Sequence, residues 1–115
     1  MASRKVIIVG GGIAGLTLAI GLRQAGIAVD VLEEQPSWRV LGVGVSLTGP
    51  TLRAFRSLGL IDQCVAVSFG YSQLQVFDRD GKQTGAIELP RLNGPDYPAQ
   101  VAIEVSDALN VDPIA

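Results

Sequence analysis

The sequence contains no histidine and a single cysteine, Cys64. Without histidine the chain cannot build a histidine-based catalytic triad, and one thiol without imidazoles cannot build a zinc site. No internal disulfide can form, and the mostly apolar stretch around Cys64 predicts a buried, inert thiol. We therefore expect no catalytic residue and no metal ligand within the chain, and a reducing compartment such as the cytoplasm.

Charge is also sparse: charged residues make up 17% of the 115 residues, and the formal net charge is −2. This balance provides no basic patch for nucleic acid, so we expect no nucleic-acid partner. Hydrophobic residues make up 48%, which is typical of a globular chain and not of a disordered one. The length suits one small domain.

An uncharged stretch, Val6 to Leu22, follows two basic residues and has the outline of an export signal or membrane segment. Two features count against that interpretation. Three successive glycines, Gly10 to Gly12, lie within the stretch, and each costs about 1 kcal/mol relative to alanine in a helix. The stretch also lacks a convincing small-residue cleavage site at its end. We expect no membrane association.

The alternative is a strand, a glycine turn and a helix, and it explains each glycine. Val6 to Val9 is a β-branched run that predicts a buried parallel strand. Gly10 then allows a tight turn, Gly12 lets the backbone approach a pyrophosphate, and Gly15 lets the helix pack closely on the strand. The start of that helix presents free N–H groups to phosphates.

An acidic residue completes this pattern. Gly26 is placed to end the helix, Ile27 to Leu32 predicts a second strand, and Glu33 follows it. Dinucleotide-binding proteins carry an acid about 20 residues beyond the glycines, where it accepts hydrogen bonds from a ribose. The alternative is an incidental glycine turn with a solvated Glu33. The combination of strand, turn, helix and acid favours the nucleotide site.

The remainder of the chain departs from simple strand–helix alternation. The patterns predict a short strand flanked by Gly42 and Gly44, a helix starting at Thr48 or Gly49 and ending at Gly59, a short helix over Ile61–Val67, a hairpin of Tyr71–Phe77 and Gln83–Leu89 with Gly81 in its turn, and a strand over Val101–Glu104. The hairpin and the glycine-flanked strand are the two departures.

Four segments together resemble a known family: "VIIVGGGIAGLTLAIGLRQAGIAVDVLEE", "LGVGVSLTGPTLRAFRSLGL", the hairpin, and "AQVAIEVSDAL". They resemble the N-terminal part of the FAD-dependent aromatic monooxygenases, the group typified by para-hydroxybenzoate hydroxylase. The resemblance implies an α/β fold with a Rossmann-like βαβ FAD-binding unit, a parallel sheet and an inserted β-hairpin. It further implies that residues 1–115 are the N-terminal part of an FAD-binding domain, with the hairpin at about 71–89 leading toward a substrate domain.

The resemblance also implies a cofactor and a set of contacts. FAD is the cofactor, NAD(P)H delivers hydride to it, and the reduced flavin activates oxygen to hydroxylate an aromatic substrate. The implied FAD-binding residues are Gly10, Gly12, Ile13, Ala14 and Gly15 at the pyrophosphate, Glu33 and Glu34 at the adenosine ribose, Arg39 at the phosphates or ribose, and Val45 and Ser46 near the flavin ring. A surface position for Arg39 is the alternative.

Two departures from the family pattern limit what is carried over. Some relatives have a histidine where Ser46 stands, and a serine can form hydrogen bonds but not act as the base. Val105 stands where the family has an FAD-contacting arginine. Three hypotheses follow: an FAD monooxygenase or its N-terminal portion, a truncated dinucleotide-binding module without catalysis, or an NAD-binding Rossmann half.

The short chain carries a further expectation. We expect it to be inactive as a monooxygenase by itself, and to hold FAD weakly or not at all. Parallel sheets are normally covered on both faces, and here one helix and part of another supply the cover. We therefore expect an exposed apolar patch that causes self-association or binds a second chain.

Overall fold

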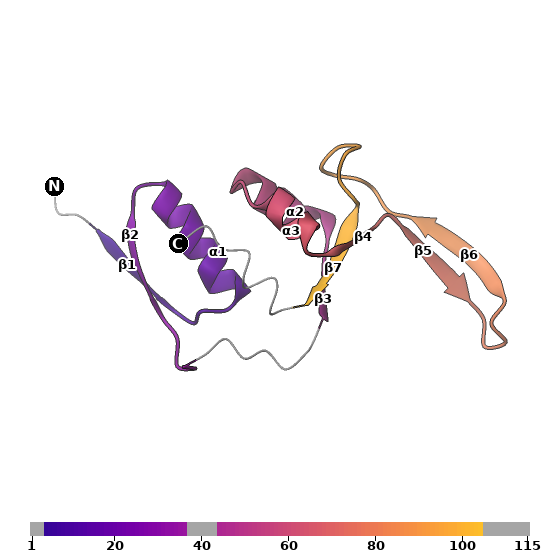
Figure 1. Cartoon of the computed structure of the whole chain (residues 1–115), viewed down its shortest axis with the longest axis horizontal. Coiled ribbons are helices and arrows are strands. Elements are labelled where there is room, and N and C mark those ends of the chain that lie inside the picture. The colour runs from indigo at the N-terminus through magenta and orange to yellow at the C-terminus, as the bar shows by residue number, and fades with distance from the viewer. Residues whose placement is uncertain (1–3, 37–43, 105–115) are drawn as a thin grey trace. The chain divides into compact units, whose positions relative to one another are not determined.

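A computed structural model describes residues 4–36 and 44–104 (Figure 1). The chain divides into two compact units, whose described parts are residues 4–36 and residues 44–104. We call them the βαβ unit and the mixed unit. The predicted domain over residues 1–115 remains a prediction.

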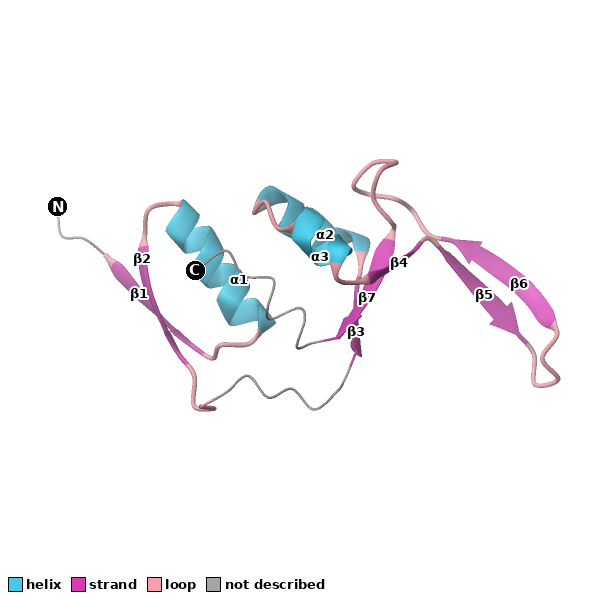
Figure 2. Ribbon diagram, viewed as in Figure 1, coloured by secondary structure: helices cyan, strands magenta, loops and turns pink. Residues whose placement is uncertain are grey.

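The βαβ unit consists of strand β1 (Lys5–Val9), helix α1 (Ile13–Gln24) and strand β2 (Ala28–Leu32), shown by type in Figure 2. The strands pair in parallel, from Lys5 opposite Ala28 to Val9 opposite Leu32. Gly26 follows the helix with φ of +76°, a conformation that glycine adopts without strain. The predicted strand, helix, helix end and second strand are therefore confirmed, with strand ends shifted by one residue.

Among residues 4–36, helix α1 covers one face of this two-stranded sheet. Ile8 on β1 is buried, as are Ala19 and Ile20 on α1. On the opposite face, Ile7 is 62% exposed and Val9 83% exposed, and Leu32, beside Val9 in the register, is 55% exposed. The predicted buried strand is therefore buried on the face that α1 covers, and the exposed side chains on its other face agree with the apolar patch that the sequence predicts.

The mixed unit is built on an antiparallel sheet of three strands in the order β3-β7-β4. Its elements are β3 (Gly44–Leu47), α2 (Gly49–Ser57), α3 (Ile61–Ala66), β4 (Phe69–Tyr71), the hairpin strands β5 (Gln73–Phe77) and β6 (Gln83–Glu88), and β7 (Gln100–Glu104). The glycine-flanked strand, both predicted helices and the last strand are confirmed with small shifts of their ends.

The mixed unit contains most of the buried side chains that the described residues provide. Its buried apolar residues are Leu47, Leu52, Phe55, Leu60, Ile61, Cys64, Ala99, Val101 and Ile103. Leu47, Val101 and Ile103 share one face of the sheet and are buried, as are Leu52 and Phe55 on α2 and Ile61 and Cys64 on α3. The other face carries Ser46, Phe69 and Ala102, which are exposed, and we call it the open face because no described element of the mixed unit covers it.

The loop before β7 is held to α2 by hydrogen bonds. Asn93 is buried and donates through Nδ2 to the Gly49 carbonyl oxygen at 3.3 Å. Arg56 donates to the Asn93 carbonyl oxygen at 3.1 Å. A side chain at Gly49 would meet Leu92 at 2.9 Å, so the close approach of loop and helix explains this glycine.

The hairpin is confirmed, but its first strand is shorter than predicted. The run expected as one strand from Tyr71 to Phe77 is divided at Ser72 into β4 and β5. The Ser72 hydroxyl accepts a hydrogen bond from the Ala99 N–H at 3.0 Å, while its carbonyl oxygen accepts one from Leu89. Tyr71 therefore pairs with β7, and Gln73 pairs with β6.

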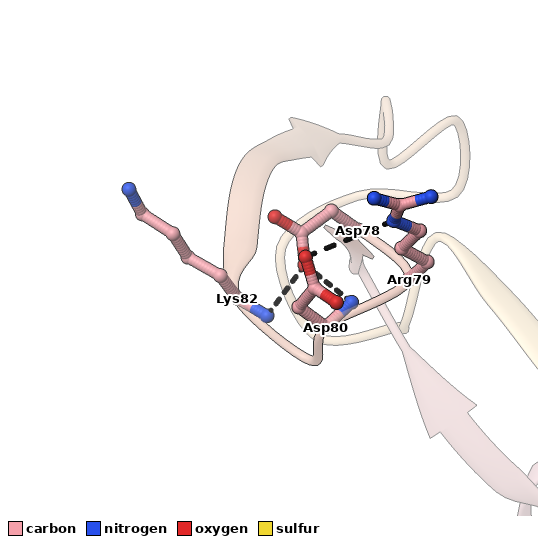
Figure 3. Close-up of polar contacts among 4 residues, drawn as sticks. All are labelled: Asp78, Arg79, Asp80 and Lys82. Atoms are coloured by element: carbon pink, nitrogen blue, oxygen red, sulfur yellow. Dashed lines mark hydrogen bonds and ion pairs between the residues drawn. The ribbon is translucent and has the colours of Figure 1, made fainter.

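The hairpin turn is held by one carboxylate, as Figure 3 shows. Asp78 Oδ1 accepts hydrogen bonds from the backbone N–H groups of Asp80 and Lys82, each at 2.9 Å. Gly81 has φ of +81°, which the turn requires. Asp80 and Gly81 thus belong to a structural turn, as the sequence indicated. In the described part of the chain, no helix is long and apolar enough to span a bilayer.

Candidate nucleotide site

The turn between β1 and α1 depends on its first glycine. Gly10 has φ of +110°, a backbone conformation that residues with a Cβ rarely adopt. Its N–H donates to the Leu32 carbonyl oxygen at 2.7 Å, which extends the β1–β2 pairing by one residue. The chain can then reverse directly above the carboxyl ends of both strands.

The other two glycines of the motif have opposite surroundings. A Cβ at Gly15 would lie 2.0 Å from the Gly10 carbonyl oxygen and 3.3 Å from an Ile8 methyl group, so only glycine permits this contact. A Cβ at Gly12 would meet nothing within 4 Å. Gly15 is therefore explained by packing inside the chain, whereas the space next to Gly12 is open to a ligand.

The start of α1 has no side-chain cap. Gly12 is the N-cap residue, with extended φ and ψ of −77° and −174°. The first intrahelical bond runs from Leu16 N–H to the Gly12 carbonyl oxygen at 2.9 Å. The N–H groups of Ile13, Ala14 and Gly15 precede that bond, and the helix offers them no acceptor of its own. This arrangement suits an anion at the positive end of the helix dipole.

Glu33 lies at the end of β2 and reaches back to the glycine turn. Its Oε2 accepts a hydrogen bond from the Gly11 N–H at 2.7 Å, and Oε1 accepts one from the Gln35 N–H at 2.9 Å. These bonds, that from Gln35 first, lower the pKa of the Glu33 carboxyl from its ordinary value. The carboxylate is exposed and stays charged at neutral pH, with further lone pairs available to a ligand.

The remaining predicted positions are divided between the parts of the chain. Glu34 is exposed beside Glu33 in the βαβ unit. Val45 and Ser46 lie on β3 of the mixed unit, where Val45 is half-buried and Ser46 is exposed on the open face. Arg39 and Val105 fall outside the described residues. The βαβ unit thus brings together the three motif glycines, the helix start and the acid.

The sequence did not predict two contacts next to the expected site residues, one made by the Gly11 N–H and one made by Tyr71 with Gln100. The Gly11 N–H contacts Glu33, although only the flanking glycines had been assigned a role. Tyr71 and Gln100 lie next to Ser46, with the Tyr71 hydroxyl 3.3 Å from Ser46 Oγ and 2.9 Å from Gln100 Oε1. Period-two alternation in "FGY" and "QVAIE" would have placed Tyr71 and Gln100 on strands. It would not have shown which strands pair.

Outside the glycine turn, the described residues offer neither a metal site nor an accessible thiol. Within residues 4–36 and 44–104, no group of histidine, cysteine, aspartate and glutamate side chains could hold a metal ion. Cys64 is fully buried, and burial raises the pKa of its thiol, which agrees with the inert thiol that the sequence predicts. An open cleft of about 550 Å³, lined by residues including Lys5, Arg23 and Asp30, lies away from the glycine turn.

Comparison with known proteins gives matches over nearly the whole chain. Residues 3–102 match a family model described as FAD binding domain. The aurachin C monooxygenase/isomerase of Stigmatella aurantiaca is 46% identical over 63 residues, which are 55% of this chain and 16% of that protein. The 3-hydroxybenzoate 6-hydroxylase of Polaromonas naphthalenivorans is 32% identical over 87 residues, or 75% of this chain and 22% of that protein.

Solved structures agree with these sequence matches. The tetrameric form of 2-methyl-3-hydroxypyridine-5-carboxylic acid oxygenase superposes with a TM-score of 0.79 and 27% identity, over 96% of this chain and 28% of that one. The chain therefore spans less than a third of the length of each of these proteins.

Proposed function

The chain belongs to the FAD-binding domain family, and on that premise we propose that its βαβ unit binds the ADP portion of FAD for a flavin-dependent monooxygenase acting on an aromatic compound. The observation that carries the proposal is the contrast between the two motif glycines. Gly15 is required by contact inside the chain, whereas Gly12 faces open space beside an uncapped helix start. A nucleotide pyrophosphate is a ligand that needs both features.

The residues present fit the cofactor. The N–H groups of Ile13 and Ala14 would bind pyrophosphate oxygens at the start of α1. Glu33 would accept hydrogen bonds from the ribose hydroxyls while its other lone pairs hold Gly11 and Gln35. Its negative charge disfavours a nucleotide with a 2′-phosphate at this position. Glu34 would lie beside the ribose, and Arg39 near the phosphates.

The mixed unit would contribute Val45 and Ser46 near the flavin ring. When bound, FAD would supply the redox chemistry, namely hydride acceptance from a reduced nicotinamide and activation of dioxygen for hydroxylation of an aromatic ring. The described residues of the chain would bind and orient that cofactor, and none of them is assigned a proton transfer. The aromatic substrate class is supported by relatives such as 3-hydroxybenzoate 6-hydroxylase.

We further propose a cytoplasmic location, and a second chain or self-association at the open apolar face of the βαβ unit.

A nucleotide-binding module without catalysis is the second candidate. It is favoured by Val105, which stands where the resemblance places an FAD-contacting arginine. An NAD-binding half is less well supported, because the antiparallel β3-β7-β4 sheet and the hairpin do not continue a strand–helix alternation.

FAD titration of the purified chain tests the proposal. We expect the chain to bind FAD weakly but saturably, as a change in FAD fluorescence, with ADP competing and with NADP, whose 2′-phosphate would face the Glu33 carboxylate, competing poorly. Gly12→Val should abolish the change, because the new side chain would fill the space next to the helix start. Absence of any FAD or ADP binding, or unchanged binding by Gly12→Val, would contradict the proposal.

A further inference from the structure

The loop over residues 89–99, between β6 and β7, contains the one asparagine of the sequence that a glycine follows, Asn93–Gly94 (Figure 1). Asparagine is a thermolabile residue, and a following glycine makes it more so, because no Cβ shields the glycine nitrogen from the asparagine side chain. None of the backbone hydrogen bonds of the described residues uses the Gly94 N–H as its donor. No such bond therefore holds the Gly94 nitrogen away from Asn93.

The reaction open to this pair is deamidation. The Gly94 nitrogen attacks Asn93 Cγ, the new N–C bond closes a succinimide ring, the Cγ–Nδ2 bond breaks, and ammonia leaves with the proton of the Gly94 N–H. Water then opens the ring at either of its carbonyl groups. One opening gives aspartate at this position. The other gives isoaspartate, in which the main chain runs through the former side chain and is longer by a methylene group.

The fold holds Asn93 away from the water that this reaction needs. Asn93 is 2% exposed, and its Nδ2 donates at 3.3 Å to the carbonyl oxygen of Gly49, the first residue of α2. Arg56 donates to the Asn93 carbonyl oxygen at 3.1 Å, and its guanidinium lies 5.9 Å from the centre of the Tyr97 ring. Water can therefore reach Asn93 only when the loop opens locally.

The closed position of Asn93 is only partly satisfied, and an aspartate would satisfy it less. Asn93 Oδ1 is buried and has no hydrogen-bond partner among the described residues, which lowers the free energy that opening the loop costs. An ionised carboxylate has no proton to donate, so an aspartate product would face the Gly49 carbonyl oxygen with a second acceptor. A buried charge without a partner is strongly destabilising.

We propose that Asn93 is a site of spontaneous covalent modification, which deamidates through a succinimide with Gly94 when the loop opens, and that the product cannot return to the buried position of Asn93. Deamidation thus releases the loop over residues 89–99 from α2, and no step reverses it. This inference does not depend on the proposed function, because neither residue belongs to the candidate nucleotide site.

Ageing of the purified chain tests the inference. The chain is incubated at mildly alkaline pH, either folded or in denaturing urea, and is digested at intervals. Mass spectrometry of the peptide that contains Asn93 measures the aspartate and isoaspartate forms. We expect both forms to accumulate in urea. In the folded chain they should form at least about tenfold more slowly, the factor that one hydrogen bond provides, because the rate follows the fraction of open loop.

Two arginines of α2 provide a matched pair of variants. Arg56→Ala removes a hydrogen bond to the loop and should raise the deamidation rate of the folded chain several-fold to about tenfold. Arg53→Ala is the control, because Arg53 is exposed on the same helix and takes no part in the contacts that hold Asn93. In urea both variants should react at the rate of the parent, which separates an effect on the loop from an effect on the chemistry.

Release of the loop has a separate readout. Hydrogen exchange of the amides in residues 92–99 should be faster in the aged, modified chain than in the fresh chain. Asn93→Asp reproduces one product and should accelerate this exchange more than Asn93→Ala does, because alanine leaves no charge to bury.

Four results would overturn the inference. They are an Asn93 peptide that gains neither aspartate nor isoaspartate, equal rates in the folded and the urea-treated parent chain, equal effects of Arg56→Ala and Arg53→Ala, and equal hydrogen exchange of the loop in aged and fresh chains. The first would show that the pair is chemically inert, the next two that the loop does not control the reaction, and the last that the modified loop closes again.

Discussion

The two units of the chain differ in how they are stabilised and in what they offer a ligand. The βαβ unit carries the glycine motif and Glu33 but buries few side chains, and one face of its sheet exposes Ile7, Val9 and Leu32. The mixed unit encloses a core between its sheet and two helices, with Leu52, Cys64 and Val101 fully buried.

This contrast shows that the nucleotide motif and the stability of the chain reside in different places. The glycine turn is determined by local geometry: one glycine with positive φ, one in close backbone contact, and one beside open space. Those features need no large core. A parallel sheet does need cover on both faces, so the βαβ unit should gain stability from whatever binds it, whereas the mixed unit should not.

Removing a core side chain should have the largest effect on the stability of the mixed unit. Leu52 is completely buried, so Leu52→Ala should lower the free energy of unfolding of the mixed unit by about 2–5 kcal/mol. Leu18→Ala on α1 is the matched control, because Leu18 is 52% exposed and its loss should cost less than about 0.5 kcal/mol. Urea unfolding monitored by amide signals measures both. Equal losses would show that the units do not differ in this way.

Adding a methyl group at Gly15 or at Gly12 compares the stability cost of two positions within the βαβ unit. Gly15→Ala would place a Cβ 2.0 Å from a backbone oxygen that cannot move freely, and should destabilise this unit by about 1–3 kcal/mol or more. Gly12→Ala meets no atom within 4 Å and should leave stability nearly unchanged. Hydrogen exchange of α1 amides measures both. A tolerated Gly15→Ala would contradict the described turn.

Glu33→Gln should affect the βαβ unit alone. In the amide an NH2 group replaces one of the two oxygens that now accept from Gly11 and from Gln35, so one of these hydrogen bonds should be lost and ADP binding should weaken on the order of tenfold. Because hydrogen bonds lower the pKa of folded Glu33 below the ordinary 4.5, its stabilising effect is complete above that pH and is lost as the pH falls through the lowered value.

Thermal unfolding at a series of pH values measures the loss of stability that the protonation of Glu33 should cause. The midpoint of the parent βαβ unit should fall on acidification by more than that of Glu33→Gln. Glu88→Gln on the hairpin is the control for a lost charge, and its βαβ unit should behave as the parent does. Identical pH profiles of parent and Glu33→Gln would show that these hydrogen bonds do not stabilise the βαβ unit.

The smallest expected effect on stability concerns the open apolar face of the βαβ unit. Val9→Lys places a charge at a side chain that is 83% exposed, so the free energy of unfolding should change by less than about 0.5 kcal/mol. Self-association should nevertheless decrease, because the exposed apolar area falls. Sedimentation velocity measures it, with Gln75→Lys on the hairpin as the control for added charge. Unchanged association in Val9→Lys would exclude this face as the contact.

Local patterns predicted the elements because each has a local cause. The ends of α1 and α2 follow from Gly26 and Gly59, both with φ of +76°, and the hairpin turn follows from Gly81. The division between β4 and β5 was missed, because it depends on a hydrogen bond from Ala99 to Ser72 across 27 residues. The β-branched run predicted a buried strand, but it does not reveal how many faces are covered, and β1 is exposed on the face that carries Ile7 and Val9.

The candidate site was predictable to the same extent. Gly10 and Gly15 have the turn and the close packing that the motif predicts, and Glu33 follows β2 as expected, whereas its contact with a ribose remains a prediction. The contact between Ser46 and Tyr71 depends on the pairing of β3 and β4 with β7, which no spacing in the sequence specifies. The assignments of Arg39 and of the flavin-ring contacts remain predictions.

Titration of ADP into the isotopically labelled chain, with amide shifts assigned residue by residue, tests the central claim most directly. We predict saturable shifts at Gly10, Gly12, Ile13, Ala14 and Glu33, little change across residues 44–104, and loss of the response in a Gly12→Val chain that otherwise retains its spectrum. Saturable shifts confined to the mixed unit, the same response in Gly12→Val, or no saturable response at all would contradict the claim that the glycine turn binds the nucleotide.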